Sequence, residues 1–289
     1  MKSRRMNKIK KTLAFGLIVS LSVIGLAACG GGNSGTETGG SVVTAGSTSV
    51  QPLSEELAAV FMDANPDYTV DVQGGGSGQG IKSIQEGIAD IGALSRNLKD
   101  EEDGSVSKEI TIALDGIAVI VNKDSAVKDL SLEQIRQIYT GEITNWKEVG
   151  GTDAPITVVS REEGSGTRGA FAEITKVLVK DDAGKETDMT VASALIQPST
   201  GSVKTTVSST PNTIGYVSLG SLDETVKAVS IEGVEPTVEM VIAGTYKISR
   251  PFIYVVGDKV SETAQKYLDF VLSEEGQAVV VDNGFISVN

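Results

Sequence analysis

The sequence predicts an α/β fold with two domains that are joined by two crossovers. Strand-type and helix-type segments alternate along the chain, which is the pattern of mostly parallel sheets covered by helices. A long β-type run, residues 109–122, is interrupted by Asp115-Gly116, and such a break in an apolar strand indicates a bend. A second strongly β-type run, residues 248–256, is expected to return the chain to its first domain.

The individual elements follow from local periodicity and turn residues. Apolar or alternating runs predict strands, which we place at residues 42–45, 68–73, 89–93, 156–160 and 212–218, with 226–231 and 240–243 as further candidates. Helical spacing of apolar residues predicts helices over 53–62, 81–87, 130–138, 169–178, 202–208, 261–272 and 274–281. Trp146 lies in a loop between two of these elements and is expected to anchor it by packing.

The N-terminus has the composition of a secretory signal. Six Lys or Arg residues precede an apolar run over residues 13–28, as in the n-region and h-region of such signals. The run ends in Leu26-Ala-Ala-Cys29, which resembles the lipobox of bacterial lipoproteins. We therefore predict a signal peptide over 1–28, lipidation of Cys29 and a flexible tether over 29–41. A plain cleaved signal and an uncleaved membrane anchor are the alternatives.

Composition disfavours several classes of function. Residues 1–28 carry six of the 25 basic residues and none of the 38 acidic ones, so the rest of the chain has a net charge of −19. Nucleic acid is not expected to bind so acidic a protein. The chain has no histidine, which rules out a Ser-His-Asp triad and any His-ligated metal within it. Cys29 is the only cysteine, so no disulfide forms within the chain.

The segment Arg161-Glu-Glu-Gly-Ser-Gly-Thr-Arg168 joins a strand-type run to a helix-type run. Gly164 and Gly166 allow a tight turn and a close approach of a ligand to the backbone. Ser165 and Thr167 stand where a helix begins, so free N–H groups, hydroxyls and the positive end of the helix dipole face one space. With the guanidinium of Arg161, these donors predict an oxyanion cradle. An ordinary N-capped helix after a glycine-rich turn is the alternative.

Further hydroxyl groups stand at other strand ends. They are Ser47, Thr48 and Ser49 before the first predicted helix, Ser77 in a glycine-rich loop, and Ser95 after the strand at 89–93. The glycine-rich loop at 74–80 fits neither G-x-G-x-x-G nor the P-loop pattern, which argues against a dinucleotide or nucleotide site. Arg96 follows Ser95, and a surface ion pair is the expected role for an arginine at that position.

Seven motifs occur in an order that resembles the phosphate-binding proteins of bacterial phosphate ABC importers. They are Ala45-Gly-Ser-Thr-Ser, Gln73-Gly-Gly-Gly-Ser-Gly, Asp90-Ile-Gly-Ala-Leu-Ser-Arg96, Leu114-Asp-Gly-Ile-Ala-Val, Ile143-Thr-Asn-Trp146, Arg161-Glu-Glu-Gly-Ser-Gly-Thr167 and Ile214-Gly-Tyr216. The ordered set covers essentially all of the mature chain. The resemblance implies a two-domain periplasmic-binding-protein fold of type II, with two crossovers and a dehydrated phosphate bound between the domains.

The resemblance also implies which residues bind the ligand. Its phosphate-binding set consists of Thr48, Ser49 and Ser77 from the first domain and Arg161, Ser165, Gly166 and Thr167 from the second. We add Ser95 and Asp115 to the expected ligand contacts. The resemblance makes Glu163 the carboxylate that orients Arg161. Many members have an Asp in place of Ser95 to accept the ligand's proton. We expect Asp115 to take that role, with Glu163 as the second candidate, although an Asp that stabilises a turn is an equal alternative for Asp115.

These observations predict a binding protein rather than an enzyme, with no catalytic residues, cofactor or metal. Domain I is expected over 42–115 and 247–289, and domain II over 116–246. The protein would be a monomer, lipid-anchored on the extracytoplasmic face of the cell membrane, and would deliver phosphate to an ABC permease with a cytoplasmic ATPase. A carrier of another tetrahedral oxyanion, such as sulfate or molybdate, is the nearest alternative. A secreted phosphatase or hydrolase and a purely structural surface lipoprotein are more distant ones.

Overall fold

The computed structural model describes residues 39–102, 104–181 and 184–289. The predicted signal peptide, Cys29 and most of the predicted tether lie outside these residues. Over the same ranges, no helix is both long enough and apolar enough to cross a membrane.

Domain I is built on the parallel strands β1 (Ser41–Gly46), β2 (Thr69–Gly74) and β3 (Ile91–Leu94), with β1 in the centre. Its helices are α1 (Gln51–Ala64), α2 (Ser77–Gln85), α7 (Glu262–Val271) and α8 (Glu274–Asp282). Leu53, Leu57 and Phe61 follow each other at helical spacing on α1, and all three are buried. Each such side chain contributes roughly 1.5–3 kcal/mol by leaving water.

Domain II has the strand order β10 (Thr213–Ser218), β6 (Thr157–Arg161) and β9 (Leu195–Gln197), and both of these pairings are parallel. Its helices are α3 (Leu132–Thr140), α4 (Gly166–Ile174), α5 (Thr200–Ser209) and α6 (Val238–Ile242). Phe171 of α4 stacks on Tyr216 of β10 with ring centroids 4.1 Å apart, and Tyr139 of α3 packs against both rings. This cluster belongs to a core that is separate from the core of domain I.

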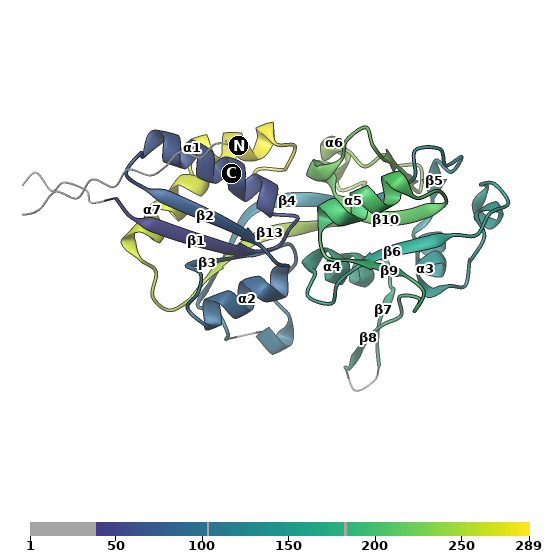
Figure 1. The fold of residues 1–289 in the computed structure, drawn as a ribbon, viewed down its shortest axis with the longest axis horizontal. Helices are drawn as coiled ribbons and strands as arrows, with labels where there is room; N and C mark the ends of the chain where they lie inside the picture. Colours follow the sequence, from purple (N-terminus) through teal and green to yellow (C-terminus); the bar gives the residue numbers. More distant parts are fainter. Residues whose placement is uncertain (1–38, 103, 182–183) are drawn as a thin grey trace, which may run out of the picture. The chain divides into compact units, whose positions relative to one another are not determined.

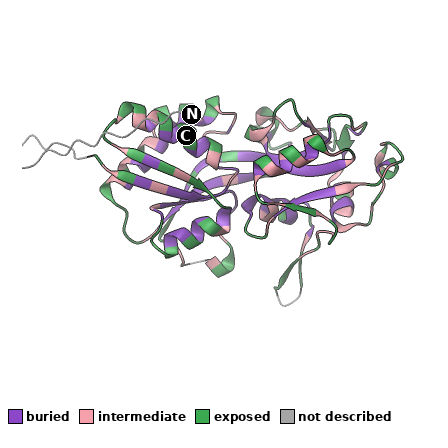
Figure 2. Ribbon diagram, in the orientation of Figure 1, coloured by how far each residue is buried: buried purple, intermediate pink, exposed green. Residues whose placement is uncertain are grey.

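Two long strands connect the domains, as Figure 1 shows: β4 (Lys108–Val121) and β13 (Ser249–Val256). The first half of β4 pairs antiparallel with β13, and from Ile117 onward β4 pairs with β10. The change of partner coincides with Asp115-Gly116, and the domain limits at this position stay a prediction. Because these crossovers pair antiparallel, the expectation of mostly parallel sheets holds only within each domain. Figure 2 shows that burial continues along both crossovers.

Shorter elements complete the described chain. They are β5 (Asp129–Leu130), β7 (Leu178–Lys180), β8 (Glu186–Asp188), β11 (Lys227–Ala228), β12 (Ser230–Ile231), η1 (Asp100–Glu102), η2 (Trp146–Val149) and η3 (Leu219–Ser221). The strand predicted at 240–243 is wrong, because Thr237 caps a short helix there by accepting a hydrogen bond from the N–H of Met240. Trp146 is buried, as expected, and its indole N–H donates to the carbonyl of Asn212.

Candidate functional site: a hydroxyl cluster at four helix starts

The loop after β1 presents hydroxyl groups that do not cap their own helix. β1 ends at Gly46, where φ is 144° and a Cβ would lie 2.2 Å from the carbonyl oxygen of Ala93. Only glycine therefore permits this turn. The N-cap of α1 is Val50, which makes no side-chain cap bond. The hydroxyls of Thr48 and Ser49 remain available to partners outside α1.

The loops after β2 and β3 bring further serines to the same edge of the sheet. Ser77 is the first residue of α2, and its Oγ accepts a hydrogen bond from the backbone N–H of Ser95 at 3.1 Å. The Oγ of Ser95 in turn accepts one from the Oγ of Ser47 at 2.8 Å. All three serines are buried. Domain I therefore contributes the ends of β1, β2 and β3 to one polar cluster.

Domain II approaches this cluster through the start of α4. Ser165 is the N-cap of α4, and its Oγ accepts from the backbone N–H of Arg168 at 3.2 Å. A Cβ at Gly166 would lie 2.2 Å from the Oγ of Ser77 and 2.7 Å from the Oγ of Ser95. Glycine is thus required for the first turn of α4 to come so close to the hydroxyls of domain I.

Thr200, the first residue of α5, also belongs to the cluster and was not identified from the sequence. Its backbone N–H donates to the Oγ1 of Thr48 at 3.2 Å, and its Oγ1 lies 2.9 Å from the Oγ of Ser49. The same Oγ1 accepts from Nη1 of Arg161 at 3.2 Å. The sequence held a signal: the hydroxyl residues 199–200 precede a glycine and the helix predicted over 202–208, as at the other sites.

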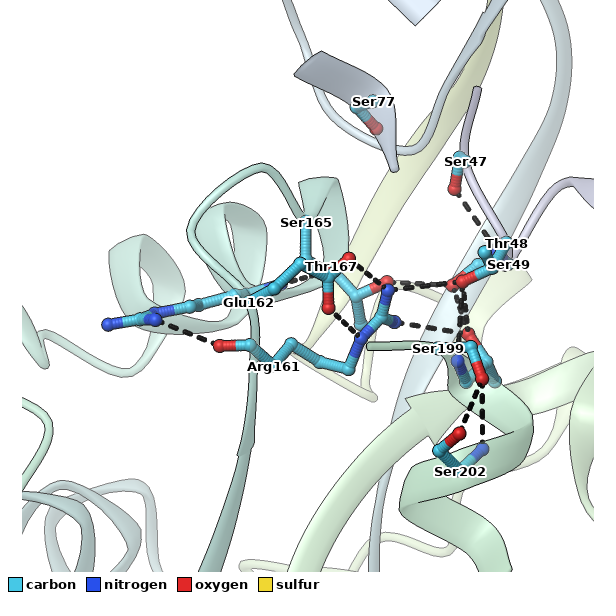
Figure 3. A network of polar contacts seen from close by, with 12 residues as sticks. Ser47, Thr48, Ser49, Ser77, Arg161, Glu162, Ser165, Thr167, Ser199 and Ser202 are labelled. Carbon is cyan, nitrogen blue, oxygen red and sulfur yellow. Dashed lines mark hydrogen bonds and ion pairs between the residues drawn. The ribbon is translucent and has the colours of Figure 1, made fainter. Parts of the chain in front are cut away.

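Donor groups from four helix starts therefore meet in one place, and Figure 3 shows the labelled members of this network. Ser49 of domain I lies 2.7 Å from Thr167 of domain II between hydroxyl oxygens, and Nη2 of Arg161 donates to the Oγ1 of Thr48 at 3.1 Å. Free N–H groups and the positive dipole ends of helices favour an anion here. The arrangement is suited to holding a small oxyanion by many hydrogen bonds at once.

Glu162 orients Arg161, so the assignment of this role to Glu163 is wrong. Nε and Nη2 of Arg161 donate to the two carboxylate oxygens of Glu162 at 2.8 and 2.7 Å. The backbone N–H of Glu162 still bonds to Gln197 of β9, which keeps its side chain beside Arg161. Glu163 lies in the turn that follows and is exposed. The side chain of Arg161 is 2% exposed and that of Glu162 is 27% exposed.

Asp115 is buried but has no free acceptor, which contradicts its expected role as acceptor of the ligand's proton. Its Oδ2 accepts from Nε and Nη2 of Arg250 at 3.1 and 2.9 Å. Its Oδ1 accepts from the Oγ of Ser218 at 2.9 Å and the N–H of Leu219 at 3.2 Å. These four bonds fill the lone-pair sites of a carboxylate. Burial raises the pKa of Asp115 above its ordinary value, against the opposing effect of Arg250.

Arg96 bonds to its own loop rather than to the hydroxyl cluster. Its Nη1 and Nη2 donate to the carboxylate of Glu102 at 2.6 and 2.7 Å, and Nη1 also reaches the carbonyl of Asn97 at 2.8 Å. Burial raises the pKa of Glu102, but the hydrogen bonds from Arg96 and from the backbone of Lys99, together with the positive charges of both residues, lower the pKa overall. Arg96 also lines a cavity of about 700 Å³ between residues 96–101 and 169–186. The ion pair predicted for Arg96 is confirmed, although Arg96 is buried and Glu102 is half-buried rather than on the open surface.

The cluster consists of hydrogen-bond donors that are suited to binding an anion. The described ranges contain no group of three or more Asp, Glu, His or Cys residues that could hold a metal ion. Tyr216 lies behind the cluster, where burial raises its pKa to about 12, so it is neutral and accepts from the backbone N–H of Arg161 at 3.3 Å. It thus supports the end of β6 without adding charge.

Comparison with known proteins gives one consistent family. Residues 31–275 match the PBP superfamily domain. The phosphate-binding protein PstS of Bacillus subtilis (strain 168) is 36% identical over 296 residues, which cover 96% of this chain and 95% of the relative. A phosphate ABC transporter substrate-binding protein from Clostridium perfringens, crystallised with bound phosphate, superposes with a TM-score of 0.81 at 46% identity, over 86% of this chain and 100% of the other. An ABC-type phosphate transport receptor from Vibrio cholerae superposes with a TM-score of 0.70 at 36% identity, over 86% of this chain and 99% of the other.

Proposed function

The chain belongs to the PBP superfamily and, within it, to the phosphate-binding protein PstS family, and from this premise we propose that it binds inorganic phosphate for import by an ABC transporter. One observation carries the proposal: four helix starts and a buried arginine converge on a single cluster of hydroxyl groups. The proposed contacts come from both domains, so a bound phosphate would join them. They are Thr48, Ser49, Ser77, Ser95, Arg161, Ser165, Gly166, Thr167 and Thr200.

The positive charge of the site is local. Residues 29–289 carry a net charge of −19, so the protein as a whole repels an anion. The positive charge of Arg161 is partly balanced by the ion pair with Glu162. Further attraction for an anion comes from helix dipoles, N–H groups and hydroxyls. Hydrogen bonds to a charged oxygen are roughly twice as strong as neutral ones, so a desolvated phosphate can be held by donors of this kind.

Binding and closure of the two domains are linked. Thr200 of domain II bonds to Thr48 of domain I, and the carbonyl of Gly164 accepts from the backbone N–H of Gly78 at 3.1 Å. A ligand that bonds to both domains favours the closed arrangement over an open one. Closure would then be the signal that a permease recognises, and the protein would act as a monomeric carrier without cofactor or metal.

The direct test is a calorimetric titration of the purified chain with phosphate, sulfate and molybdate at fixed pH and salt. We expect one phosphate per chain and weaker binding of the other two anions. Tighter binding of sulfate or molybdate would assign the protein to another oxyanion. The family is one of transport receptors, and we expect no turnover of a phosphate ester in a parallel assay. Sustained turnover would show an enzyme.

The proposed location is the extracytoplasmic face of the cell membrane, through a lipid on Cys29. The basis is the motif Leu26-Ala-Ala-Cys29 after an apolar signal and before a glycine-rich tether. Cys29→Ala should release the protein from the membrane fraction or block its processing. A variant that is matured and retained like the wild type would rule out the lipid anchor.

A further inference from the structure

A buried ion pair lies where β4 changes partners between the two domains. Asp115 of β4 and Arg250 of β13 are directly opposite in the antiparallel register, and their side chains are 0% and 1% exposed. The next residue of β4, Gly116, pairs with Ser249 of β13. The residue after it, Ile117, pairs with Ser218 of β10. The pair therefore lies where the crossover strands pass from one domain to the other.

The same pair bonds to one strand end from each domain. Oδ1 of Asp115 accepts from the hydroxyl of Ser218 and the N–H of Leu219, at the end of β10 in domain II. Nη1 of Arg250 donates to the carbonyl oxygen of Ser95 at 3.2 Å, directly after β3 in domain I. An unbroken chain of hydrogen bonds thus runs from Ser218 through the ion pair to Ser95.

Ser95 is the member of the hydroxyl cluster that this chain reaches. Its backbone N–H is bonded to Ser77, its hydroxyl to Ser47 and its carbonyl to Arg250. A Cβ at Gly166 would lie only 2.7 Å from its Oγ, so a small displacement of Ser95 would alter the fit against the start of α4. Ser95 thus has three bonding partners, and Arg250 is the one that lies on a crossover strand.

Stability alone does not explain the pair. Removing two charges from water costs several kcal/mol per ion, and apolar residues of similar volume are often as stable in their place. We propose that Arg250, held by Asp115, is a positioning residue for the phosphate site: it fixes Ser95 relative to β10, so that the bend of the crossovers sets the geometry of the donors. The inference rests on the proposed function, because it concerns the affinity of that site.

Arginine is suited to this task and lysine is not. Three nitrogens of Arg250 donate in fixed directions, two to Asp115 and one to Ser95. An ammonium group keeps the charge but cannot reproduce this planar set of bonds. Arg250→Lys therefore tests position separately from charge.

The experiment is a double-mutant cycle on phosphate affinity, with the wild type, Arg250→Lys, Ser95→Ala and the double variant titrated by calorimetry. We expect Arg250→Lys to weaken binding about tenfold in the wild-type background and less than about twofold in the Ser95→Ala background. A general loss of structure would cost the same in both backgrounds. Equal losses in the two backgrounds, or no loss in either, would overturn the proposal.

Two additions keep the outcome decisive. If Arg250→Lys does not fold, the paired change Asp115→Asn with Arg250→Met removes both charges, and its loss of affinity must again shrink when Ser95 is Ala. Arg136→Lys is the matched control, since Arg136 forms exposed ion pairs with Glu133 and Glu142 and should leave affinity unchanged. A wild type that binds no phosphate would defeat the proposed function and this inference together. A wild type that binds without coupling would defeat the inference alone.

Discussion

Two arginine–carboxylate pairs, each with a buried guanidinium, serve different ends in this protein. Arg161 and Arg250 are 2% and 1% exposed, and each donates two hydrogen bonds to a carboxylate. Glu162 keeps 27% of its side chain exposed, whereas Asp115 has none. The other donors of Arg161 go to threonine hydroxyls of both domains, and the other donor of Arg250 goes to a backbone carbonyl.

The bonding partners of a buried arginine decide whether its guanidinium is available to a ligand. A threonine hydroxyl can rotate and exchange its partner, so Arg161 can transfer bonds to an anion without leaving a buried acceptor unmet. The partners of Arg250 are a carboxylate and a carbonyl, which cannot be left unpaired inside the protein without a penalty. Arg161 is therefore suited to binding and Arg250 to holding the scaffold.

The largest expected effect comes from breaking the scaffold pair. Asp115→Asn leaves the buried charge of Arg250 without its counter-charge, and we expect a loss of about 3–5 kcal/mol of unfolding free energy in urea denaturation. The ratio of phosphate to sulfate affinity should stay within about twofold of the wild type, because Asp115 offers no free acceptor. A large change in that ratio would restore Asp115 as a ligand contact. Asp153→Asn, in an exposed ion pair, is the control.

Breaking the binding pair should affect affinity instead of stability. Arg161→Ala removes charge-assisted bonds to the anion, and we expect a loss on the order of 3 kcal/mol or more, which is about a hundredfold in the dissociation constant. Titration calorimetry measures the loss, with Arg136→Ala as a control at a half-buried arginine of α3. An affinity within about threefold of the wild type would remove Arg161 from the site.

A smaller effect is expected at the hydroxyl partner of Arg161. Thr200→Val keeps the shape of the side chain but deletes the oxygen that bonds to Ser49 and Arg161. We expect phosphate to bind about tenfold more weakly. Thr205→Val, on an exposed position of the same helix, should have no effect. Equal affinities for the two variants would exclude Thr200 from the contacts.

The orienting carboxylate allows a test between neighbours. Glu162→Gln weakens the hold on Arg161 but leaves an amide oxygen that can still accept, so we expect about a fivefold loss of phosphate affinity. Glu163→Gln should stay within about twofold, because Glu163 is exposed in the turn. A larger loss of phosphate affinity in Glu163→Gln than in Glu162→Gln would reinstate Glu163 as the orienting residue.

The smallest effect concerns the pair Arg96–Glu102 and the stability of the fold in acid. The pKa of Glu102 is lowered from its ordinary 4.5, so its contribution is present above that value and is lost as pH falls through the lowered pKa. Glu102→Gln should therefore cost about 1 kcal/mol or less near pH 7, and this cost, measured by urea denaturation, should shrink as the pH falls through the lowered pKa. Glu101→Gln, at an exposed carboxylate, is the control. A cost that grows in acid would contradict the sign of this shift.

Features that depend on neighbouring residues could be predicted from the sequence. Glycines 74–76, 164 and 166, and the hydroxyl residues beside them, predicted helix starts that bind an anion, because turn conformation and capping are local properties. The break at Asp115-Gly116 predicted the crossover, and the ordered motifs predicted the family. The predicted helix over 169–178 begins earlier, at Gly166, since the N-cap is set by the Ser165 side chain.

Which distant side chains become hydrogen-bond partners depends on how remote segments of the chain pack together. Asp115 and Arg250 are 135 positions apart, and no local pattern couples them. Thr200 joins the cluster because β9 places the start of α5 beside Arg161. Glu162 replaces Glu163 because the backbone N–H of Glu162 bonds to the carbonyl of Gln197 in β9, just past the end of β6. Direction and distance between remote side chains follow from packing, and packing depends on the whole chain.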